Sequence, residues 1–149
     1  MKQWEGREFP ATDWLVVTQD RIQKFADATE DRQWIHLDTQ RAQRESPFGG
    51  TIAHGFLTLS LLSYWMKQAI QIRSGLAMAV NYGLNKVRFP SAVRAGSQVR
   101  AHVTLLLVKE SAEFVDATFL IRVESQGAES QVSEKPCCVA EWLVRYYPQ

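Results

Sequence analysis

One strongly apolar segment, followed by a series of alternating stretches, constrains the fold of this chain more than any other feature. The apolar side chains of residues 55–70 cover nearly every side of a helix, and they are Phe56, Leu57, Leu59, Leu61, Leu62, Tyr64, Trp65, Met66, Ala69 and Ile70. A helix that is apolar all round belongs in a protein core. The segment would be about 24 Å long at 1.5 Å per residue. It is too short and too polar for a bilayer span of about 20 residues, so we expect a buried helix.

The chain after this segment alternates between apolar and polar side chains, as half-buried strands do. Residues 98–108 and 114–124 show the alternation clearly, and residues 78–89 and 136–146 are the other long stretches. Sequential strands with short connections favour an antiparallel meander. The sequence therefore predicts an α+β fold in which an antiparallel sheet wraps one long central helix.

Length and charge narrow the class of protein. The 149 residues fit a single domain, 1–149, and the net charge of +1 gives no basic footprint for nucleic acid. The first residues lack the apolar core of a signal peptide, so we expect a cytoplasmic protein without a membrane segment. Cys137 and Cys138 are adjacent and would point to opposite faces of a strand. We interpret them as two reduced thiols, and they form no zinc-binding pattern.

Short helices are expected before the apolar segment. Thr18 is a suitable N-cap for a helix that ends near Thr29 or Glu30. Asp38 can cap a second short helix that runs through Ala42. The residues between these helices hold the most unusual polar pair of the chain.

Asp31 and His36 are five residues apart. On a continuous helix they would lie about 140° from each other, because an α-helix has 3.6 residues per turn. They can converge only if the first helix ends near Asp31 and the chain turns back through Gln33 and Trp34. A converging carboxylate and imidazole would suit proton transfer. The alternative is a carboxylate near a helix end and an unrelated surface histidine.

Gly55 opens the apolar helix. The first turn of a helix presents unpaired N–H groups with a partial positive charge, and glycine lets a ligand approach the backbone closely. Gly55 is therefore a candidate donor to a developing oxyanion. The alternative is that glycine here only allows tight helix packing.

Other polar residues allow more than one role. His54 could act as a second acid or could fix its loop by hydrogen bonding. The Ser63 hydroxyl could bond back to a helix carbonyl or line a pocket. His102 lies in an alternating stretch and is most simply structural. The chain has no nucleophile elbow, phosphate loop or dinucleotide fingerprint.

A known family shares this arrangement of residues. Residues 31–38 read DRQWIHLD, residues 52–56 read IAHGF and residues 81–90 read NYGLNKVRFP. Together they resemble the MaoC-like R-specific enoyl-CoA hydratases, in particular the branch similar to nodulation protein N. The resemblance extends over nearly the whole chain, from about Asp13 to Tyr146.

The resemblance implies a hot-dog fold and a homodimer whose two sheets join edge to edge. It implies a hydro-lyase of fatty acid metabolism that hydrates trans-2-enoyl-CoA to (3R)-3-hydroxyacyl-CoA, or catalyses the reverse dehydration. The substrate would be a thioester of CoA or of acyl carrier protein, and the chemistry would need no cofactor and no metal.

Site residues also follow from the resemblance. Asp31 and His36 would hold a water, with Asp31 as the base and His36 as the group that orients the water and supplies a proton. Gly55 would provide the oxyanion N–H, and the substrate-binding residues would be Ser63, His54, Phe56, Tyr82 and Asn85. Many relatives have Asn-Pro-Leu or Asn-Pro-Ile before the histidine, whereas this chain has Gln-Trp-Ile at residues 33–35. This departure leaves the preferred acyl chain length open.

Three other functions remain compatible with the sequence. A (3R)-hydroxyacyl-carrier-protein dehydratase would differ mainly in its carrier. A hot-dog acyl-CoA thioesterase often takes a carboxylate from the central helix, and residues 55–70 contain none. A non-catalytic acyl-thioester binding protein would keep the fold without turnover.

Overall fold

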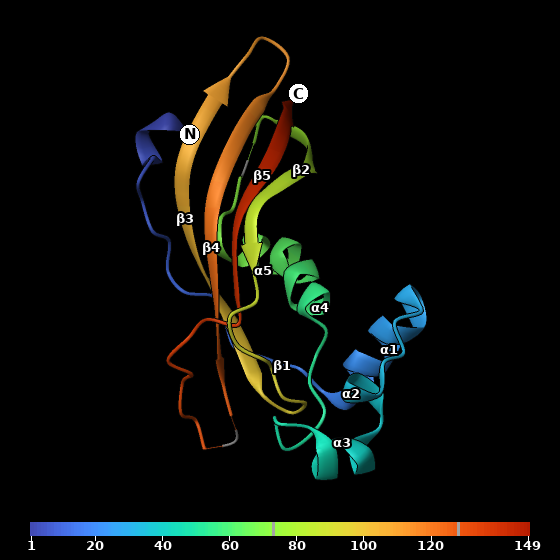
Figure 1. Ribbon diagram of the computed structural model, residues 1–149. Helices are drawn as coiled ribbons and strands as arrows, with labels where there is room; N and C mark the ends of the chain where they lie inside the picture. Colours follow the sequence, from blue (N-terminus) through green and yellow to red (C-terminus); the bar gives the residue numbers. More distant parts are fainter. Residues whose placement is uncertain (73, 128) are drawn as a thin grey trace.

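An antiparallel sheet curls over a central helical segment (Figure 1). The computed structural model describes residues 1–72, 74–127 and 129–149. Its strands lie in the order β1-β3-β4-β5-β2, and they are β1 (Leu15–Val16), β2 (Leu76–Arg88), β3 (Gln98–Glu110), β4 (Val115–Gln126) and β5 (Cys138–Pro148). The long strands agree with the predicted stretches, and the α+β class is confirmed.

Alternating side chains of β3, β4 and β5 form the core against the central helical segment. The buried residues on the inner face of the sheet include Val99, Ala101, Val103, Leu105, Ala117, Phe119, Ile121, Val123, Trp142 and Val144. They pack on Leu57, Leu62 and Trp65 of the helical segment. Burying one face of each strand explains why the period-two pattern predicted the strands correctly.

The predicted meander is correct for β3, β4 and β5 but wrong for β2. Strand β2 pairs antiparallel with β5, at the far side of the sheet from β3. The edge of β3 is already occupied. Gly6 and Phe9 donate their backbone N–H groups to Leu105 and Val103, at 2.7 and 2.9 Å. Because this N-terminal segment fills the β3 edge, β2 takes the remaining edge beside β5.

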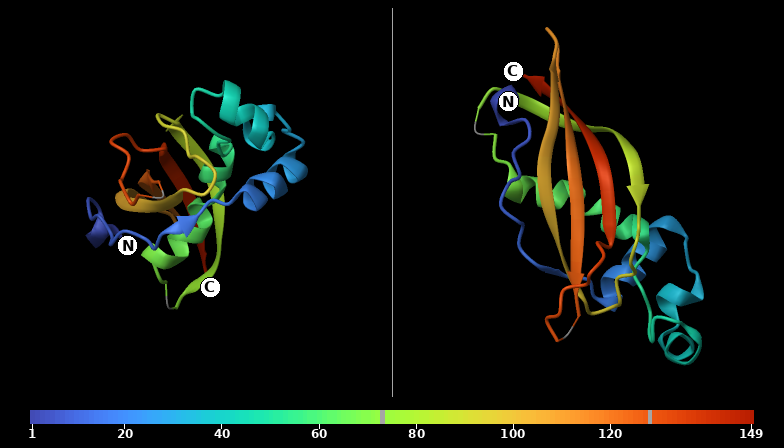
Figure 2. Two further views of the ribbon diagram at one scale, coloured as in Figure 1. Left: turned by 90° about the horizontal axis from the view of Figure 1, so that it is seen from below. Right: turned by 60° about the vertical axis from the view of Figure 1, so that its left-hand side comes forward.

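The central helical segment differs from the prediction in two ways. It consists of α4 (Gly55–Ser60) and α5 (Leu62–Ala69), with a break at Leu61. It is also not buried on every side, since Phe56 is 67% and Tyr64 is 46% exposed. The sheet covers only one side of these helices (Figure 2). The apolar side chains on the other side therefore stay exposed in the single chain.

The predicted shorter helices are present beside the start of α4 (Figure 1). The first, α1 (Gln19–Thr29), is capped by Thr18, whose hydroxyl accepts from the Arg21 N–H at 3.1 Å. The second predicted helix is α3 (Thr39–Glu45), capped by Asp38 and longer than expected. A further short helix, α2 (Trp34–Leu37), was not predicted, and a 3-10 turn, η1 (Lys2–Trp4), lies near the N-terminus. Among the described residues no helix has the length and apolar character of a bilayer span.

Candidate active site

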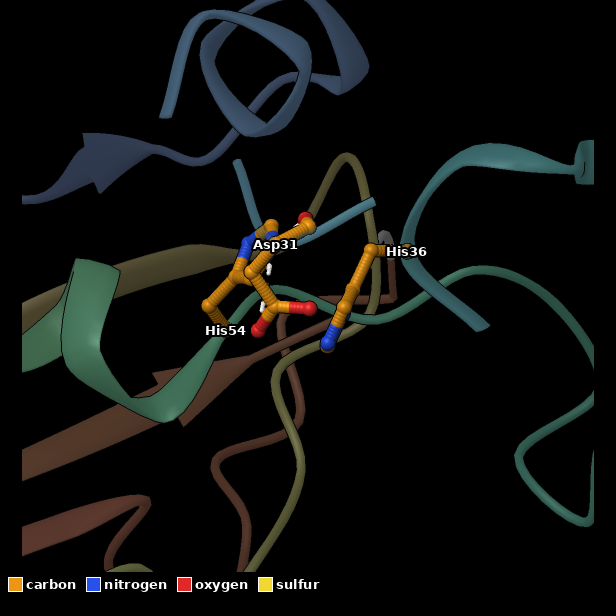
Figure 3. A group of neighbouring side chains, drawn as sticks. All are labelled: Asp31, His36 and His54. Atoms are coloured by element: carbon orange, nitrogen blue, oxygen red, sulfur yellow. Dashed lines mark hydrogen bonds and ion pairs between the residues drawn. The ribbon is translucent and has the colours of Figure 1, made fainter. Parts of the chain in front are cut away.

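A break between α1 and α2 brings Asp31 and His36 together, as the spacing argument required. Glu30 ends α1 in the left-handed conformation, with φ 61°. Asp31 follows in an irregular stretch, and α2 begins at Trp34. The two side chains therefore come from separate elements, and both face His54 (Figure 3).

Backbone contacts from the loop before α4 fix the His36 ring. Its Nδ1 lies 2.7 Å from the carbonyl oxygen of Ile52, and the Ile52 N–H donates to the carbonyl of Ile35 at 3.0 Å. A carbonyl oxygen only accepts, so Nδ1 carries the proton and Nε2 has a free lone pair. His36 is only 6% exposed, and it is therefore held as a neutral base in one orientation.

Gln19 and Thr51 support His36 from the other side, and neither residue was predicted to belong to the site. The side-chain amide of Gln19 donates to the backbone carbonyl of His36 at 2.7 Å. The hydroxyl of Thr51 donates to the amide oxygen of Gln19 at 2.6 Å. This chain of hydrogen bonds ties the start of α1 to α2 and to the loop before α4.

His54 contacts both members of the pair. Its Nε2 lies 3.0 Å from the backbone oxygen of Asp31 and 4.0 Å from the carboxylate Oδ2. Its ring stacks on the ring of His36, with centroids 3.8 Å apart and planes at 24°. Phe25 also contacts the His54 ring, at a centroid distance of 5.0 Å. His54 thus fixes its loop by hydrogen bonding, one of the two roles that the sequence allowed.

The environment of His36 favours its neutral form. Burial lowers its pKa from the ordinary value of 6.5, and the nearby His54 lowers it further. The hydrogen bond to the Ile52 carbonyl and the charge of Asp31 act in the opposite direction without reversing the shift. At neutral pH the Nε2 lone pair is therefore available to accept a proton.

Asp31, His36 and His54 offer one potential ligand atom each, and these atoms lie within 4.8 Å of one another. Their arrangement does not fit a metal ion. An ion lies in the plane of each imidazole that binds it, at about 2.0–2.1 Å from the nitrogen for zinc. The two rings are stacked, so their planes do not meet at one such point. A spacing of this size instead suits a single water between the carboxylate and an imidazole.

Gly55 lies beside His36 at the start of α4. Both residues line a cavity of about 320 Å³, together with Phe48, Ile52, Phe89 and Cys137. The N–H of a first helical residue has no partner within the helix. A Cβ on Gly55 would lie 2.8 Å from the ring carbons of Phe89, so only glycine fits beneath this ring.

Several predicted substrate-binding residues lie apart from the pair. Ser63 and Tyr82 line a hollow of about 340 Å³ between the central helices and β2, and Asn81 donates to the Ser63 hydroxyl at 3.4 Å. Phe56 packs edge-on against Phe89, with centroids 5.9 Å apart. Asn85 lies on β2 opposite Glu141 and lines neither this hollow nor the cavity beside His36.

A second cavity adjoins this hollow. Its volume is about 430 Å³, and its mostly apolar wall includes Met66, Leu76, Trp142 and Val144. Ser63 and Asn81 line both spaces. The structure therefore forms one polar group around His36 and a separate, largely apolar space along the central helices.

Comparisons with known proteins show which family the chain resembles. A family model described as "MaoC like domain" matches residues 2–124. The chain is 48% identical to 3-hydroxyacyl-thioester dehydratase Z of Mycobacterium tuberculosis over 142 residues, which are 95% of this chain and 89% of the relative. It is 42% identical to nodulation protein N of Rhizobium leguminosarum bv. viciae over 138 residues, 93% of this chain and 83% of the relative.

Solved structures show the same fold. The R-hydratase PhaJ1 from Pseudomonas aeruginosa matches with a TM-score of 0.73 and 21% identity, over 97% of this chain and 83% of that chain. The (R)-hydratase from A. caviae involved in PHA biosynthesis matches with a TM-score of 0.73 and 24% identity, over 94% of both chains. At such low identity these likenesses concern the fold alone, and they confirm the predicted hot-dog architecture.

Proposed function

Because the chain belongs to the MaoC-like family and is an enzyme of its dehydratase and hydratase class, we propose that it hydrates trans-2-enoyl-CoA to (3R)-3-hydroxyacyl-CoA and catalyses the reverse dehydration. The observation that carries the proposal is the neutral His36 ring, which lies beside the Asp31 carboxylate and lines one cavity with Gly55. Enzymes of this class interconvert 3-hydroxyacyl and enoyl thioesters. The carrier and the stereochemistry are the finer parts of the proposal.

In hydration, the Asp31 carboxylate and Nε2 of His36 hold one water between them. Nε2 takes a proton from this water as the oxygen bonds to C3 of the enoyl thioester. The resulting imidazolium returns a proton to C2 on the same face, so one water is added and the enzyme is regenerated. Dehydration follows the same steps in reverse. Asp31 accepts the second O–H of the water and stabilises the imidazolium.

This assignment reverses the roles that the sequence suggested. There Asp31 was the base and His36 supplied the proton. The Nδ1–H bond to the Ile52 carbonyl and the lowered pKa of His36 leave Nε2 without a proton to donate in the resting state. His36 therefore accepts a proton first and returns one later.

Addition to C3 moves negative charge onto the thioester oxygen. The N–H of Gly55 meets this oxygen, and the partial positive charge at the start of α4 adds to the stabilisation. The loss of one such donor costs about 3 kcal/mol of transition-state stabilisation in enzymes that depend on it. No metal or redox cofactor enters these steps.

The acyl chain runs from the catalytic pair along the central helices. The hollow that Ser63 shares with Tyr82 and the apolar cavity that adjoins it offer surfaces of suitable polarity for the distal part of the chain. Met66 and Trp142 line the apolar cavity and would limit the length of chain accepted.

A second copy of the chain joins through β2. This strand pairs with β5 on one side and has an open edge on the other. It also exposes Met78, Val80 and Leu84 to solvent, at 53%, 43% and 42%. Unpaired strand edges and apolar patches mark association surfaces. Edge-to-edge pairing of two β2 strands gives the homodimer that the family resemblance implied.

The experiment is a hydratase assay that follows loss of enoyl absorbance from crotonyl-CoA, with chiral analysis of the product. Asp31→Asn and His36→Gln should each lower kcat by about 10²-fold or more, with unchanged circular dichroism. His102→Gln, which alters a histidine on β3 away from the cavity, is the control and should retain activity. Wild-type rates for both site variants, or an (S) product, would contradict the proposal.

Parallel assays separate the alternatives. Rapid release of free thiol would indicate a thioesterase, although α4 and α5 carry no carboxylate that could act. Turnover with acyl carrier protein thioesters but not with CoA thioesters would assign the carrier-protein dehydratase. Tight acyl-CoA binding without turnover would indicate a binding protein.

A further inference from the structure

We propose that His54 is a positioning residue that fixes both members of the catalytic pair, Asp31 through a backbone hydrogen bond and His36 through ring stacking. This inference rests on the proposed function of the pair. It adds a residue that touches neither the water nor the thioester in that mechanism, and that sets the position and charge of the groups that do.

The contact with Asp31 holds an otherwise irregular stretch. Residues 30–33 form neither helix nor strand, and the Asp31 side chain is about half exposed. The Nε2–H of His54 donates to the Asp31 carbonyl at 3.0 Å, which anchors this stretch to the start of α4. Since His54 is the N-cap residue of α4, this hydrogen bond holds Asp31 at a fixed position relative to the N–H of Gly55.

The contact with His36 shields one face of its ring. The stacked rings are 3.8 Å apart, and Phe25 contacts the His54 ring as well. The stack shields that face of the His36 ring from water and leaves the Nε2 edge free, and such burial disfavours the charged form of the ring. His54 thereby helps to keep His36 in the neutral form that accepts a proton.

A buried nitrogen fixes the state of His54 itself. Its Nδ1 has no hydrogen-bond partner among the described residues, and the side chain is only 3% exposed. A proton on Nδ1 would become a buried donor without an acceptor, which is costly. The Asp31 carbonyl faces Nε2 and can only accept, so the proton of this contact lies on Nε2.

The surroundings contain few other groups that titrate. Asp31 is the anion that faces the two rings from the stretch after α1, and it favours the protonated form of His36. Cys137 lines the same cavity from the residues before β5, and burial raises its pKa to about 12, so it stays neutral. A change in the titration of His36 can thus be assigned to His54 or to Asp31.

Two substitutions separate the two contacts. His54→Gln can keep an N–H donor near the position of Nε2 but removes the stacked ring. It should retain most of kcat, while His36 titrates at higher pH because water reaches its ring. His54→Phe keeps a stacked ring but removes the donor. It should lower kcat by about 10- to 100-fold, as small displacements of catalytic groups do, while the titration of His36 stays near that of wild type.

The measurements are pH profiles of kcat and kcat/KM, together with NMR titration of the His36 ring in each variant. His102→Gln again serves as the control and should change neither quantity. If both His54 variants leave kcat and the titration of His36 unchanged, the inference is wrong. It is also wrong if His54→Gln and His54→Phe show the same pattern of loss.

The wild-type protein provides a test that needs no variant to fold. Nitrogen chemical shifts of the two rings report which nitrogen carries the proton. We expect Nε2–H for His54 and Nδ1–H for His36 at pH 7, and a proton on Nδ1 of His54 would overturn the inference. This result does not depend on turnover. The proposed function fails separately, if Asp31→Asn and His36→Gln remain active.

Discussion

Nδ1 of His36 lies 2.7 Å from the carbonyl oxygen of Ile52, and this contact decides which ring nitrogen carries the proton. It joins α2 to the loop that leads into α4, so the helix that carries the imidazole and the helix that carries the Gly55 N–H are positioned together. The acceptor is a backbone atom, which no side-chain substitution at residue 52 removes. The orientation of the catalytic ring is therefore built into the path of the chain.

The lowered pKa of His36 predicts a pH-dependent contribution to stability. The unfolded chain takes up a proton at this side chain near its ordinary pKa of 6.5, whereas burial delays protonation of the folded chain to lower pH. The contribution is complete above pH 6.5 and is lost as pH falls through the lower pKa of the folded state. Urea unfolding between pH 5 and 8 should show this loss in wild type and its absence in His36→Gln. Parallel curves for the two proteins would contradict it.

Gly55→Ala should destabilise the protein and reduce activity, because the new methyl group would meet the Phe89 ring at 2.8 Å. Overpacking of this kind typically costs about 1–3 kcal/mol. The double variant Gly55→Ala with Phe89→Ala should recover part of the stability in thermal unfolding. Gly127→Ala is the control, since a Cβ there meets nothing within 4 Å. A stable single variant would show that the ring moves aside freely.

The two cysteines should resist alkylation in the folded protein. Burial raises the pKa of Cys137 to about 12 and that of Cys138 to about 11, and the thiolate is the reactive form. Iodoacetamide at pH 8 should leave both unmodified by mass spectrometry until denaturant is added. Rapid modification of Cys137 without denaturant would mean that the cavity beside His36 opens widely in solution.

Lysine at the open edge of β2 should disrupt the homodimer. Val80→Lys and Leu84→Lys replace exposed apolar side chains with charges that a second β2 strand would have to bury. Light scattering should show a shift to monomer. Leu106→Lys is a matched control, because Leu106 is 40% exposed but lies on β3. An equal shift with the control would place the interface elsewhere.

Thr51→Val should weaken the support of His36. The substitution keeps the shape of the side chain but removes the hydroxyl that donates to Gln19 at 2.6 Å. Leaving the half-buried Gln19 oxygen without this partner should cost about 1 kcal/mol, measured by denaturant unfolding, and kcat should fall more than KM changes. Thr118→Val on β4 is the control and should have little effect on either quantity.

The local pattern of the sequence predicted the elements well. Alternation identified β3 and β4 because each strand buries one face, and Thr18 and Asp38 were correct helix caps because capping depends on the next three residues. The position of β2 was not predictable in the same way. It depends on the hydrogen bonds from Gly6 and Phe9 to β3, which join residues far apart in the chain.

In the candidate site, too, local features were predictable from the sequence and contacts between distant segments were not. The break between Asp31 and His36 was predictable from helix geometry, and the sequence correctly placed Gly55 at the start of an apolar helix. The supports of His36 were not, since Gln19, Thr51 and Ile52 reach it through single hydrogen bonds between distant segments. The tautomer of His36 also depends on such a contact, because the carbonyl of Ile52 accepts from Nδ1. No spacing in the sequence indicates this contact.

The N-terminal segment along β3 has a consequence for solution behaviour. Residues 6–12 already occupy that edge, so β2 provides the other edge of the sheet in the described part of the chain. If two chains pair through β2, as proposed, both of these edges are used and association should stop at two copies. Removal of the segment would expose the β3 edge, so that each chain would have two unpaired strand edges. Chains could then polymerise head to tail into fibres. We therefore expect this segment to limit aggregation of the protein.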